Sequence, residues 1–350
     1  MTAYLYTLKG ERQVSLAPEM DRMYWKEHDG TVLVEVWQFA SVGCSMRQRG
    51  RKVLHPSGRR YVPDLAEDVG SWSAYEVTWK QWRPHLAGRS LLLSEVKRLL
   101  MTRGVREEVL SDRCVRRVLQ VGVLRREVKL LSSIRMTGGQ ARWKCERCHA
   151  GRNQLRRTEC ARCGGICYYC DHCLLLGRAQ ACEPLLQVEG EGYRGGTRNL
   201  DDNSAQSLTA AQQRAADAAL QFVKQGEAPM MLMWAVTGAG KTEMTFDVIA
   251  HVLRRGGRVA VASPRKDVVD ELTPRFREAF SGVNIVKLHG DSGETWNEGE
   301  LVIATTHQLW RWYHAFDLIV VDEVDAFPYR HSAALQAGLR RALTVHGQHL

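Results

Sequence analysis

Short apolar runs alternate with segments of helical periodicity in the C-terminal part of the chain, from Leu208 onward. Strands separated by helix-length segments predict a parallel sheet with helices on both faces. The pattern therefore predicts an α/β fold for residues 208–350. The apolar runs are MMLMWAV (230–236), RVAVA (258–262), NIVKL (284–288), LVIAT (301–305) and DLIVV (317–321).

The N-terminal part has a weaker pattern that mixes a predicted strand with helices. The apolar run TVLVEVWQFASVG (31–43) predicts a strand. Residues 91–134 repeat apolar positions at helical intervals, with breaks around Gly104 and Gly122. We expect a mixed α+β domain with basic helical segments over residues 1–140.

A polar, glycine-rich stretch at residues 188–207 has almost no apolar periodicity, which is typical of a linker. The cysteines cluster just before it. The predicted order is therefore an N-terminal domain (1–140), a cysteine-rich module (141–187), the linker (188–207) and the α/β domain (208–350).

Composition and charge narrow the class of protein. The 350 residues are 44% hydrophobic and 25% charged, which is ordinary globular usage and excludes collagen-like, disordered and coiled-coil classes. The net charge of +10 is local, because residues 89–157 hold 18 Lys+Arg and 6 Asp+Glu. This patch favours contact with a phosphate backbone, although a solvated helical face would give the same count. No run approaches the roughly 18 apolar residues of a membrane span, so we expect a soluble, intracellular chain.

Eight of the ten cysteines lie between positions 145 and 182, several of them as C-x-x-C pairs. In a reducing compartment this pattern points to metal rather than to disulfides. Two C-x-x-C turns about a dozen residues apart can place four thiolates at the corners of a tetrahedron, which is the geometry of structural Zn²⁺. The assignment we favour puts the first zinc on Cys145, Cys148, Cys160 and Cys163.

The other four cysteines could complete a second zinc site, although spacing alone does not settle the pairing. This second set is Cys167, Cys170, Cys173 and Cys182. The side chains around the cysteines could present a surface that stacks on bases and binds phosphates, or could simply cover the metal. They are His149, Tyr168, Tyr169, Arg147, Arg152, Arg156 and Arg157.

Residues 235–242 read Ala-Val-Thr-Gly-Ala-Gly-Lys-Thr, directly after a predicted strand and before an amphipathic helix. A phosphate-binding loop needs small residues so that backbone N–H groups can curl around the phosphates. Lys241 would reach the β- and γ-phosphates, and the Thr242 hydroxyl would coordinate Mg²⁺. Ala235 replaces the first glycine of the general pattern.

An acidic segment, Asp322-Glu323-Val324-Asp325, follows the apolar run DLIVV. A carboxylate at the C-terminal end of a parallel strand lies beside the phosphate loop in doubly wound sheets. Asp322 is therefore predicted to hold Mg²⁺, and Glu323 to orient and polarise the attacking water. The predicted catalytic residues are Lys241, Asp322 and Glu323.

The phosphate loop, the DExD segment and the upstream Gln212 together resemble the first RecA-like lobe of superfamily 2 helicases, over residues 208–350. The resemblance implies that the amide of Gln212 pairs with the adenine edge. The residues predicted to bind nucleotide are Gln212, Thr237, Gly238, Ala239, Gly240, Lys241, Thr242 and Glu243.

Two further strand ends resemble the loops of such helicases that contact the backbone of single-stranded DNA. Their hydroxyls, Arg265 and the helix start at Thr306 are suitable phosphate donors, although the same residues serve loops and caps in other proteins. The predicted DNA contacts are Ser263, Pro264, Arg265, Thr305, Thr306, His307 and Gln308.

The chain resembles the ComFA family of DEAD-like ATPases more closely. The resemblance rests on a cysteine module placed before the helicase lobe, on Cys-Tyr-Tyr-Cys-x-x-Cys-x3-Gly-Arg (167–178) and on Asp-Glu-Val-Asp-Ala-Phe-Pro-Tyr (322–329). PriA helicases also combine cysteine clusters with a helicase motor, but they carry the cysteines within its second half. The order along the chain therefore favours ComFA.

The resemblance implies an ATP-driven motor that moves incoming single-stranded DNA during natural transformation. It implies a cytoplasmic location at the inner face of the membrane, with ATP, Mg²⁺ and Zn²⁺ as cofactors. The implied partners are single-stranded DNA, ComFC, DprA and the membrane DNA-uptake channel. The alternative is a zinc-dependent nucleic-acid or protein-binding adaptor with a regulatory nucleotide lobe. Because no second helicase lobe follows residue 350, we expect a fragment that binds ATP and DNA but hydrolyses ATP poorly.

Overall fold

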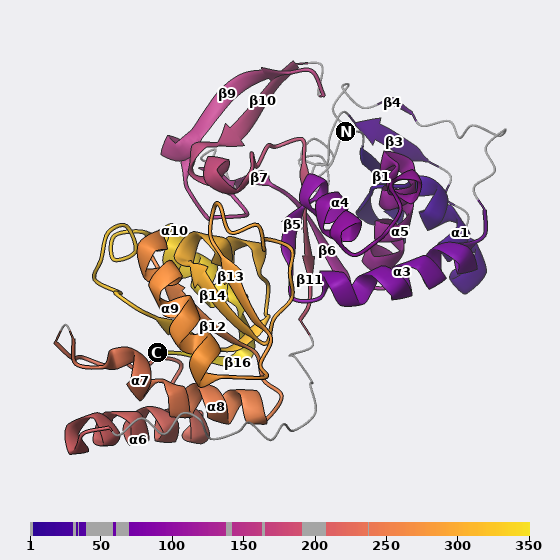
Figure 1. Cartoon of the computed structure of the whole chain (residues 1–350). Coiled ribbons are helices and arrows are strands. Elements are labelled where there is room, and N and C mark those ends of the chain that lie inside the picture. Colours follow the sequence, from indigo (N-terminus) through magenta and orange to yellow (C-terminus); the bar gives the residue numbers. More distant parts are fainter. Residues whose placement is uncertain are drawn as a thin grey trace. The chain divides into compact units, whose positions relative to one another are not determined.

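The computed structural model describes two compact units, Met1–Glu189 and Gly190–Leu350, each of which is treated by itself (Figure 1). The described residues are 3–30, 33, 35–39, 59–60, 70–137, 142–162, 165–190, 208–236 and 238–350. The predicted linker therefore lies mostly outside the described residues.

The second unit is built on a five-stranded sheet in which every pair of neighbouring strands is parallel. Its order is β13-β14-β12-β15-β16. The α/β fold predicted for this part of the chain is confirmed. The strands are β12 (Val259–Ser263), β13 (Ile285–Leu288), β14 (Leu301–Thr305), β15 (Phe316–Val321) and β16 (Leu343–His349).

Helices cover the sheet because its central strands are apolar on both faces. Alternate residues of β12, such as Val259 and Val261, pack into a core shared with α6, α8 and α9. The intervening Ala260 and Ala262 are buried as well. The helices of the unit are α6 (Ala210–Gln225), α7 (Lys241–Met244), α8 (Phe246–Arg254), α9 (Lys266–Ala279), the 3-10 helix η4 (Thr306–Arg311) and α10 (Ala333–Ala342).

The apolar run at 230–236, predicted as a strand, forms only a single parallel bridge, between Met230 and His349 of β16. Met231 and Met233 pack against the core, whereas Leu232 and Trp234 are 62% and 89% exposed. The prediction of a full strand is therefore wrong, because only one residue of the run forms a bridge with β16.

The first unit begins with a four-stranded antiparallel sheet of order β2-β1-β3-β4, and helix α1 follows β2 along the chain. The predicted strand at 31–43 is described only as β3, and most of its other residues lie outside the described ones. These elements are β1 (Ala3–Leu8), β2 (Glu11–Ser15), α1 (Pro18–Asp29), β3 (Val36–Phe39) and β4 (Arg59–Arg60).

Three helices and a second antiparallel sheet, of order β5-β11-β6, form the rest of this unit's core. The helix break predicted around Gly122 falls two residues later, because α5 runs through Gly122 and ends at Leu124. A Cβ at Gly122 would lie 2.7 Å from Trp79 of α3, so glycine permits a close helix crossing. The elements are α3 (Trp72–Leu86), β5 (Ser90–Leu92), α4 (Leu93–Thr102), η1 (Glu107–Leu110), α5 (Asp112–Leu124), β6 (Val128–Ser132) and β11 (Pro184–Val188).

The cysteine-rich module is inserted between β6 and β11 and so belongs to the same unit as the N-terminal elements. Strand β11 overlaps the predicted end of the module and start of the linker, yet it pairs with β5 and β6. The inserted elements are β7 (Ile134–Thr137), β8 (Arg142–Cys145), η2 (Arg152–Gln154), β9 (Leu155–Cys160), β10 (Gly165–Cys170) and η3 (Asp171–Leu176).

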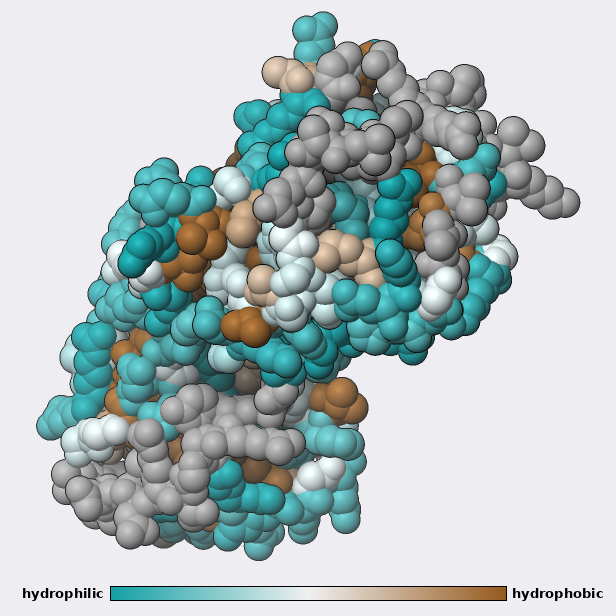
Figure 2. All heavy atoms as spheres, turned by 90° about the vertical axis from the view of Figure 1, so that its right-hand side faces the viewer, coloured by the Kyte–Doolittle hydropathy of each residue, from teal (hydrophilic) through white to brown (hydrophobic). Residues whose placement is uncertain are grey.

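The face drawn in Figure 2 is mostly hydrophilic, with apolar side chains in separate small groups. Among the helices of the described ranges, none combines the length and the apolarity that crossing a bilayer requires.

One buried carboxylate connects three elements of the first unit. Asp21 of α1 accepts hydrogen bonds from Tyr6 of β1 (2.6 Å), from Ser15 of β2 and from Gln120 of α5 (3.0 Å). Burial raises the pKa of Asp21 to about 7, and the hydrogen bonds only partly oppose this rise. At pH values between the ordinary aspartate pKa and about 7, the folded state therefore holds a proton on Asp21 that an unfolded chain would release.

We expect the stability of the first unit to fall as the pH rises from 4 to 7, because the unfolded state loses the Asp21 proton first over this range. The change is on the order of 4 kcal/mol. Asp21→Asn, which cannot ionise, should flatten this part of the profile in urea unfolding measured at several pH values. Asp29→Asn, at the exposed end of the same helix, should leave the slope intact; equal slopes in the wild type and Asp21→Asn would contradict this assignment.

Candidate nucleotide and metal sites

The predicted phosphate loop joins the 230–236 segment to helix α7. Gly238 and Gly240 have φ angles of 78° and 72°, in the left-handed region that favours glycine, and α7 begins at Lys241. Thr237 lies outside the described residues. The glycines thus allow the chain to turn sharply before the helix, as a phosphate loop requires.

Two of the predicted nucleotide-binding side chains contact this loop. The Lys241 ammonium donates to the carbonyls of Ala235 (3.2 Å) and Val236 (3.4 Å). Gln212 donates from Nε2 to the carbonyl of Ala239 (2.9 Å) and accepts from the backbone N–H of Thr209 (2.7 Å). The structure therefore brings Gln212 of α6 against the loop, although its amide is engaged with the chain's own backbone.

Glu243, by contrast, pairs with Arg275 of α9. Its carboxylate is thus engaged within the protein. Thr242 is half-buried on the first turn of α7.

The acidic segment follows β15, at the edge where the parallel strands end. The backbone N–H of Asp322 donates to Ala262 of β12, and the Asp322 carboxylate accepts from the N–H of Glu323 (3.0 Å). Glu323 has a φ of 56°, which is uncommon for a residue with a side chain. Its Oε2 atom is buried and has no hydrogen-bond partner among the described residues. A buried carboxylate oxygen without a partner favours a ligand or water beside it.

The predicted DNA contacts divide into buried and accessible side chains. Ser263, Thr306 and Gln308 are buried, and Gln308 accepts from Arg311 (2.5 Å). The prediction that these three side chains contact DNA therefore does not fit the structure, because buried side chains are not accessible to DNA. Pro264, Thr305 and His307 are half-buried and Arg265 is exposed, with its guanidinium paired to Asp267.

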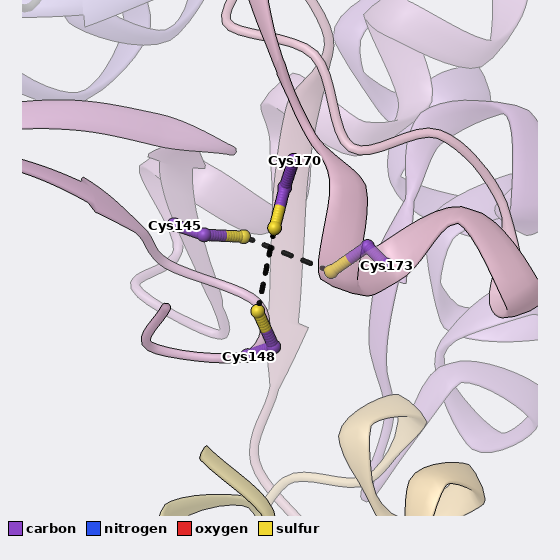
Figure 3. A group of neighbouring side chains, drawn as sticks. All are labelled: Cys145, Cys148, Cys170 and Cys173. Atoms are coloured by element: carbon purple, nitrogen blue, oxygen red, sulfur yellow. Dashed lines mark hydrogen bonds between the residues drawn. The ribbon is translucent and has the colours of Figure 1, made fainter. Parts of the chain in front are cut away.

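Four cysteine side chains converge on one point in the first unit (Figure 3). Cys145 and Cys148 flank the turn after β8, Cys170 ends β10 and Cys173 lies in η3. All four are buried, and their sulfurs lie within 4.8 Å of one another. The separations are 3.8 Å for Cys145–Cys173 and 3.6 Å for Cys148–Cys170.

These separations fit a tetrahedral metal site. Four sulfurs placed about 2.3 Å from a central ion at tetrahedral angles lie roughly 3.8 Å apart. A disulfide would require a sulfur–sulfur distance near 2 Å. The four side chains can therefore hold a metal ion without rearrangement.

The thiols also influence one another's ionisation. Hydrogen bonds from Cys148, Cys170 and Cys173 lower the pKa of Cys145, whereas a thiolate at Cys145 raises the pKa values of Cys148 and Cys173. Metal ligation requires thiolates, so a bound divalent cation would favour the ionised form of the cysteines that ligate it.

The favoured ligand assignment from sequence, in which Cys145 and Cys148 share a metal with Cys160 and Cys163, is wrong. In the β9–β10 hairpin, Cys170 pairs with Leu155 and Gly165 with Cys160, so Cys160 and Cys170 stand at opposite ends. The turn at 145–148 lies at the Cys170 end. Strand register therefore decides a pairing that spacing leaves open.

A second group forms at the other end of the hairpin. The sulfurs of Cys160, Cys167 and Cys182 lie within 4.8 Å of one another, and Cys160–Cys182 is 3.8 Å. Cys163 lies outside the described residues. The second predicted set is thus also corrected, since Cys160 replaces Cys170 and Cys173 in it.

A buried ion pair joins the first cluster to helix α4. Arg147, between two of the cysteines, is fully buried and donates to Glu95 (2.7 Å) and to the carbonyl of Gly177 (3.2 Å). The surface role considered for Arg147 is therefore wrong. Burial tends to lower the pKa of Arg147, but Glu95 and the cysteines hold it above its ordinary value. Its positive charge can offset the net negative charge of a four-thiolate metal site.

Family models match both units. Residues 76–187 match the N-terminal domain of competence protein ComFA, and residues 206–341 match the type III restriction enzyme res subunit family. The first match spans α3 to β11, so the inserted cysteine module lies within one family domain.

Curated relatives support the same family. The chain is 38% identical to competence protein ComFA of Bacillus subtilis, over 57% of this chain and 42% of the relative. It is 37% identical to ComFA of Streptococcus pneumoniae, over 59% of this chain and 49% of the relative. The predicted resemblance to ComFA is confirmed. The chain spans about half the length of these ComFA relatives.

The alternative relative, PriA, matches less of the chain. Replication restart protein PriA of a Synechocystis species is 30% identical over 36% of this chain and 16% of its own length. The ComFA relatives match a larger share of the chain at higher identity, so ComFA is the better comparison.

We expect the triple variant Cys160→Ser, Cys167→Ser and Cys182→Ser to keep one tightly bound metal ion per chain, measured by elemental analysis. The Cys145, Cys148, Cys170 and Cys173 cluster stays intact in it. Under the pairing favoured from sequence spacing, the same variant would break both sites. Complete loss of bound metal from a folded variant would therefore contradict the structural pairing.

Glu95→Ala should destabilise the first unit by about 3–5 kcal/mol, because it leaves the Arg147 charge buried without its partner. Chemical denaturation would measure the change. Replacing both members, with Glu95→Leu and Arg147→Met, should cost less than Glu95→Ala alone. A double variant that is less stable than the single one would contradict a buried, paired charge.

Proposed function

We propose that the chain is part of an ATP-driven motor that moves single-stranded DNA during DNA uptake. The observation that carries this proposal is a phosphate loop and an acidic strand end in one parallel-sheet unit of a ComFA-like chain. The PriA-like alternative has weaker support, because PriA matches a smaller share of the chain.

The loop geometry supports a role for Lys241 in phosphate binding. Its ammonium has three donors, and two of them lie near the carbonyls of Ala235 and Val236. A phosphate entering the loop could therefore take the remaining donor or displace a carbonyl. The backbone at Gly238 and Gly240 would contribute N–H groups to the same anion.

The acidic strand end supports a role in hydrolysis. Thr242 and Asp322 supply the hard oxygen ligands that Mg²⁺ prefers, and the ion would offset the phosphate charges. Glu323 has one buried carboxylate oxygen without a partner, which could accept a hydrogen bond from the attacking water. Gln212 would exchange its contact with Ala239 for the adenine edge.

The cysteine clusters would hold Zn²⁺, with Cys145, Cys148, Cys170 and Cys173 as the first site. Four sulfur ligands leave no open position for water, so this ion would stabilise the fold rather than catalyse. Cys160, Cys167 and Cys182 would contribute ligands to a second. ComFC, DprA and the uptake channel belong to this proposal through the family resemblance alone, as does a location at the inner face of the membrane.

We propose further that these 350 residues bind ATP and DNA but turn ATP over slowly. Motors of the resembled superfamily close the nucleotide between two lobes, and the second supplies arginines that stabilise the transferred phosphoryl group. The curated ComFA relatives extend well beyond the matched region.

Lys241→Ala should weaken binding of a fluorescent ATP analogue by about tenfold or more, since one charged phosphate contact is typically worth at least 1.4 kcal/mol. Lys266→Ala removes an exposed lysine that pairs with Asp291, and it should leave the affinity unchanged. Equal affinity in Lys241→Ala and the wild type would contradict the nucleotide site. Rapid DNA-stimulated hydrolysis that Lys241→Ala abolishes would contradict slow turnover alone.

A further inference from the structure

Residues 72–188 have the element order of a winged-helix domain. Along the chain, α3 is followed by β5, α4, α5, β6 and then β11. The three strands form a sheet of order β5-β11-β6. In this arrangement α5 takes the place of the helix that reads a DNA major groove. The connection from β6 to β11, residues 133–183, takes the place of the wing and carries the cysteine clusters.

Helix α5 is already covered by the N-terminal elements of the same unit. Gln120 donates to Asp21 and accepts from the N–H of Leu16 (2.9 Å), and Arg117 pairs with Glu19 (2.9 Å). The middle of the helix, residues 117–122, is buried. Groove reading by this face of α5 is therefore blocked. In this arrangement the wing is a second element that can contact nucleic acid.

The β9–β10 hairpin of the wing, which is labelled in Figure 1, has two chemically different faces. Directly opposed residues of an antiparallel pair lie on the same face. In the strand register, Arg157 lies directly opposite Tyr168. On the other face of the hairpin, Arg156 lies directly opposite Tyr169. The two pairs are adjacent along both strands, so each provides a matched control for the other.

The Tyr168 face carries rings and an available charge. The Tyr168 ring lies 4.5 Å from the ring of Trp143, with 32° between their planes, and both residues are half-buried. Arg157 is exposed, and the described residues offer it no hydrogen bond or ion pair. Glu159 lies nearer the hairpin turn on this face, opposite Ile166, which is 54% exposed.

On the other face, the arginine and the tyrosine are already engaged with side chains of the protein itself. Arg156 pairs with Asp171 (2.6 Å), and the Arg178 guanidinium lies 4.8 Å from the Tyr169 ring. Cys160 and Cys167 of the second cluster also lie on this face. Only the Tyr168 face therefore combines a half-exposed ring pair with an unpaired cation.

We propose that three residues of the Tyr168 face, Trp143, Tyr168 and Arg157, bind single-stranded DNA. We call these three residues the ring face. A base stacks on the aromatic pair, and a neighbouring phosphate meets the Arg157 guanidinium. The surplus of basic residues over 89–157 matches a polyanionic partner. Rings that need an unstacked base favour a single strand over a duplex. This inference rests on the proposed function, because it names the surface that would hold the DNA.

The test is fluorescence anisotropy of the metal-loaded 350-residue chain with a labelled oligothymidylate of about twenty nucleotides. Tyr168→Leu should weaken binding by about tenfold, within the range for one base stacked on a ring, whereas Tyr169→Leu should change it less than twofold. With an oligonucleotide that lacks bases, Tyr168→Leu should bind as well as the wild type. Equal metal content in all variants verifies that the module is folded.

Arg157→Ala is the independent variant, since its side chain is exposed and its loss should not disturb folding. It should weaken binding and reduce the slope of log affinity against log salt by about 0.7, as loss of one phosphate contact to a single strand predicts. Arg156→Ala should leave the slope unchanged, because that guanidinium is paired with Asp171.

The outcomes separate this inference from the proposed function. A wild-type chain that binds the oligonucleotide while Tyr168→Leu and Arg157→Ala bind equally well overturns the ring face and leaves the motor proposal standing. Preference for a duplex of the same length also overturns it. Failure of the wild-type chain to bind single-stranded DNA contradicts the DNA part of the proposed function itself.

Discussion

The convergence of Cys145, Cys148, Cys170 and Cys173 is the constraint on which the first unit depends. It joins the turn after β8 to the end of the β9–β10 hairpin, two segments that share no strand pairing with each other. A four-thiolate site gathers negative charge in a buried place, and Arg147 brings a compensating charge from within the turn itself. Through Glu95 that charge is anchored on α4, so a buried ion pair joins the cysteine cluster to the helical core.

A different constraint governs the second unit. Parallel strands end at a common edge, and there the acidic segment after β15 is tied to β12 through the hydrogen bond from Asp322 to Ala262. Left-handed glycines turn the predicted phosphate loop into α7, and Gln212 of α6 contacts the same loop. Glu323, one of the residues proposed to act on nucleotide, has a positive φ, which is uncommon for a residue with a side chain.

Local sequence predicted the features that depend on local chemistry. Apolar runs such as RVAVA and DLIVV predicted the sheet, and Gly-Ala-Gly-Lys-Thr predicted a glycine-rich turn that leads into a helix. Spacing could not predict the cysteine pairing, because the register of β9 and β10 decides which thiols meet. Glu95 gave a faint signal as a lone acid in the apolar LLLSEVKRLL, but its partner lies 52 residues away. Burial of Thr306 and Gln308 likewise depends on packing that no motif encodes.

The central claim is that one motor binds both nucleotide and single-stranded DNA. The most direct test is whether binding of one changes the affinity for the other. The affinity of the zinc-loaded chain for oligothymidylate should be measured with and without a non-hydrolysable ATP analogue and Mg²⁺. A motor predicts that the analogue changes DNA affinity by about fivefold or more, that DNA changes analogue affinity by the same factor, and that Lys241→Ala removes both effects. Identical DNA affinity with and without the analogue in the wild-type chain would contradict the account.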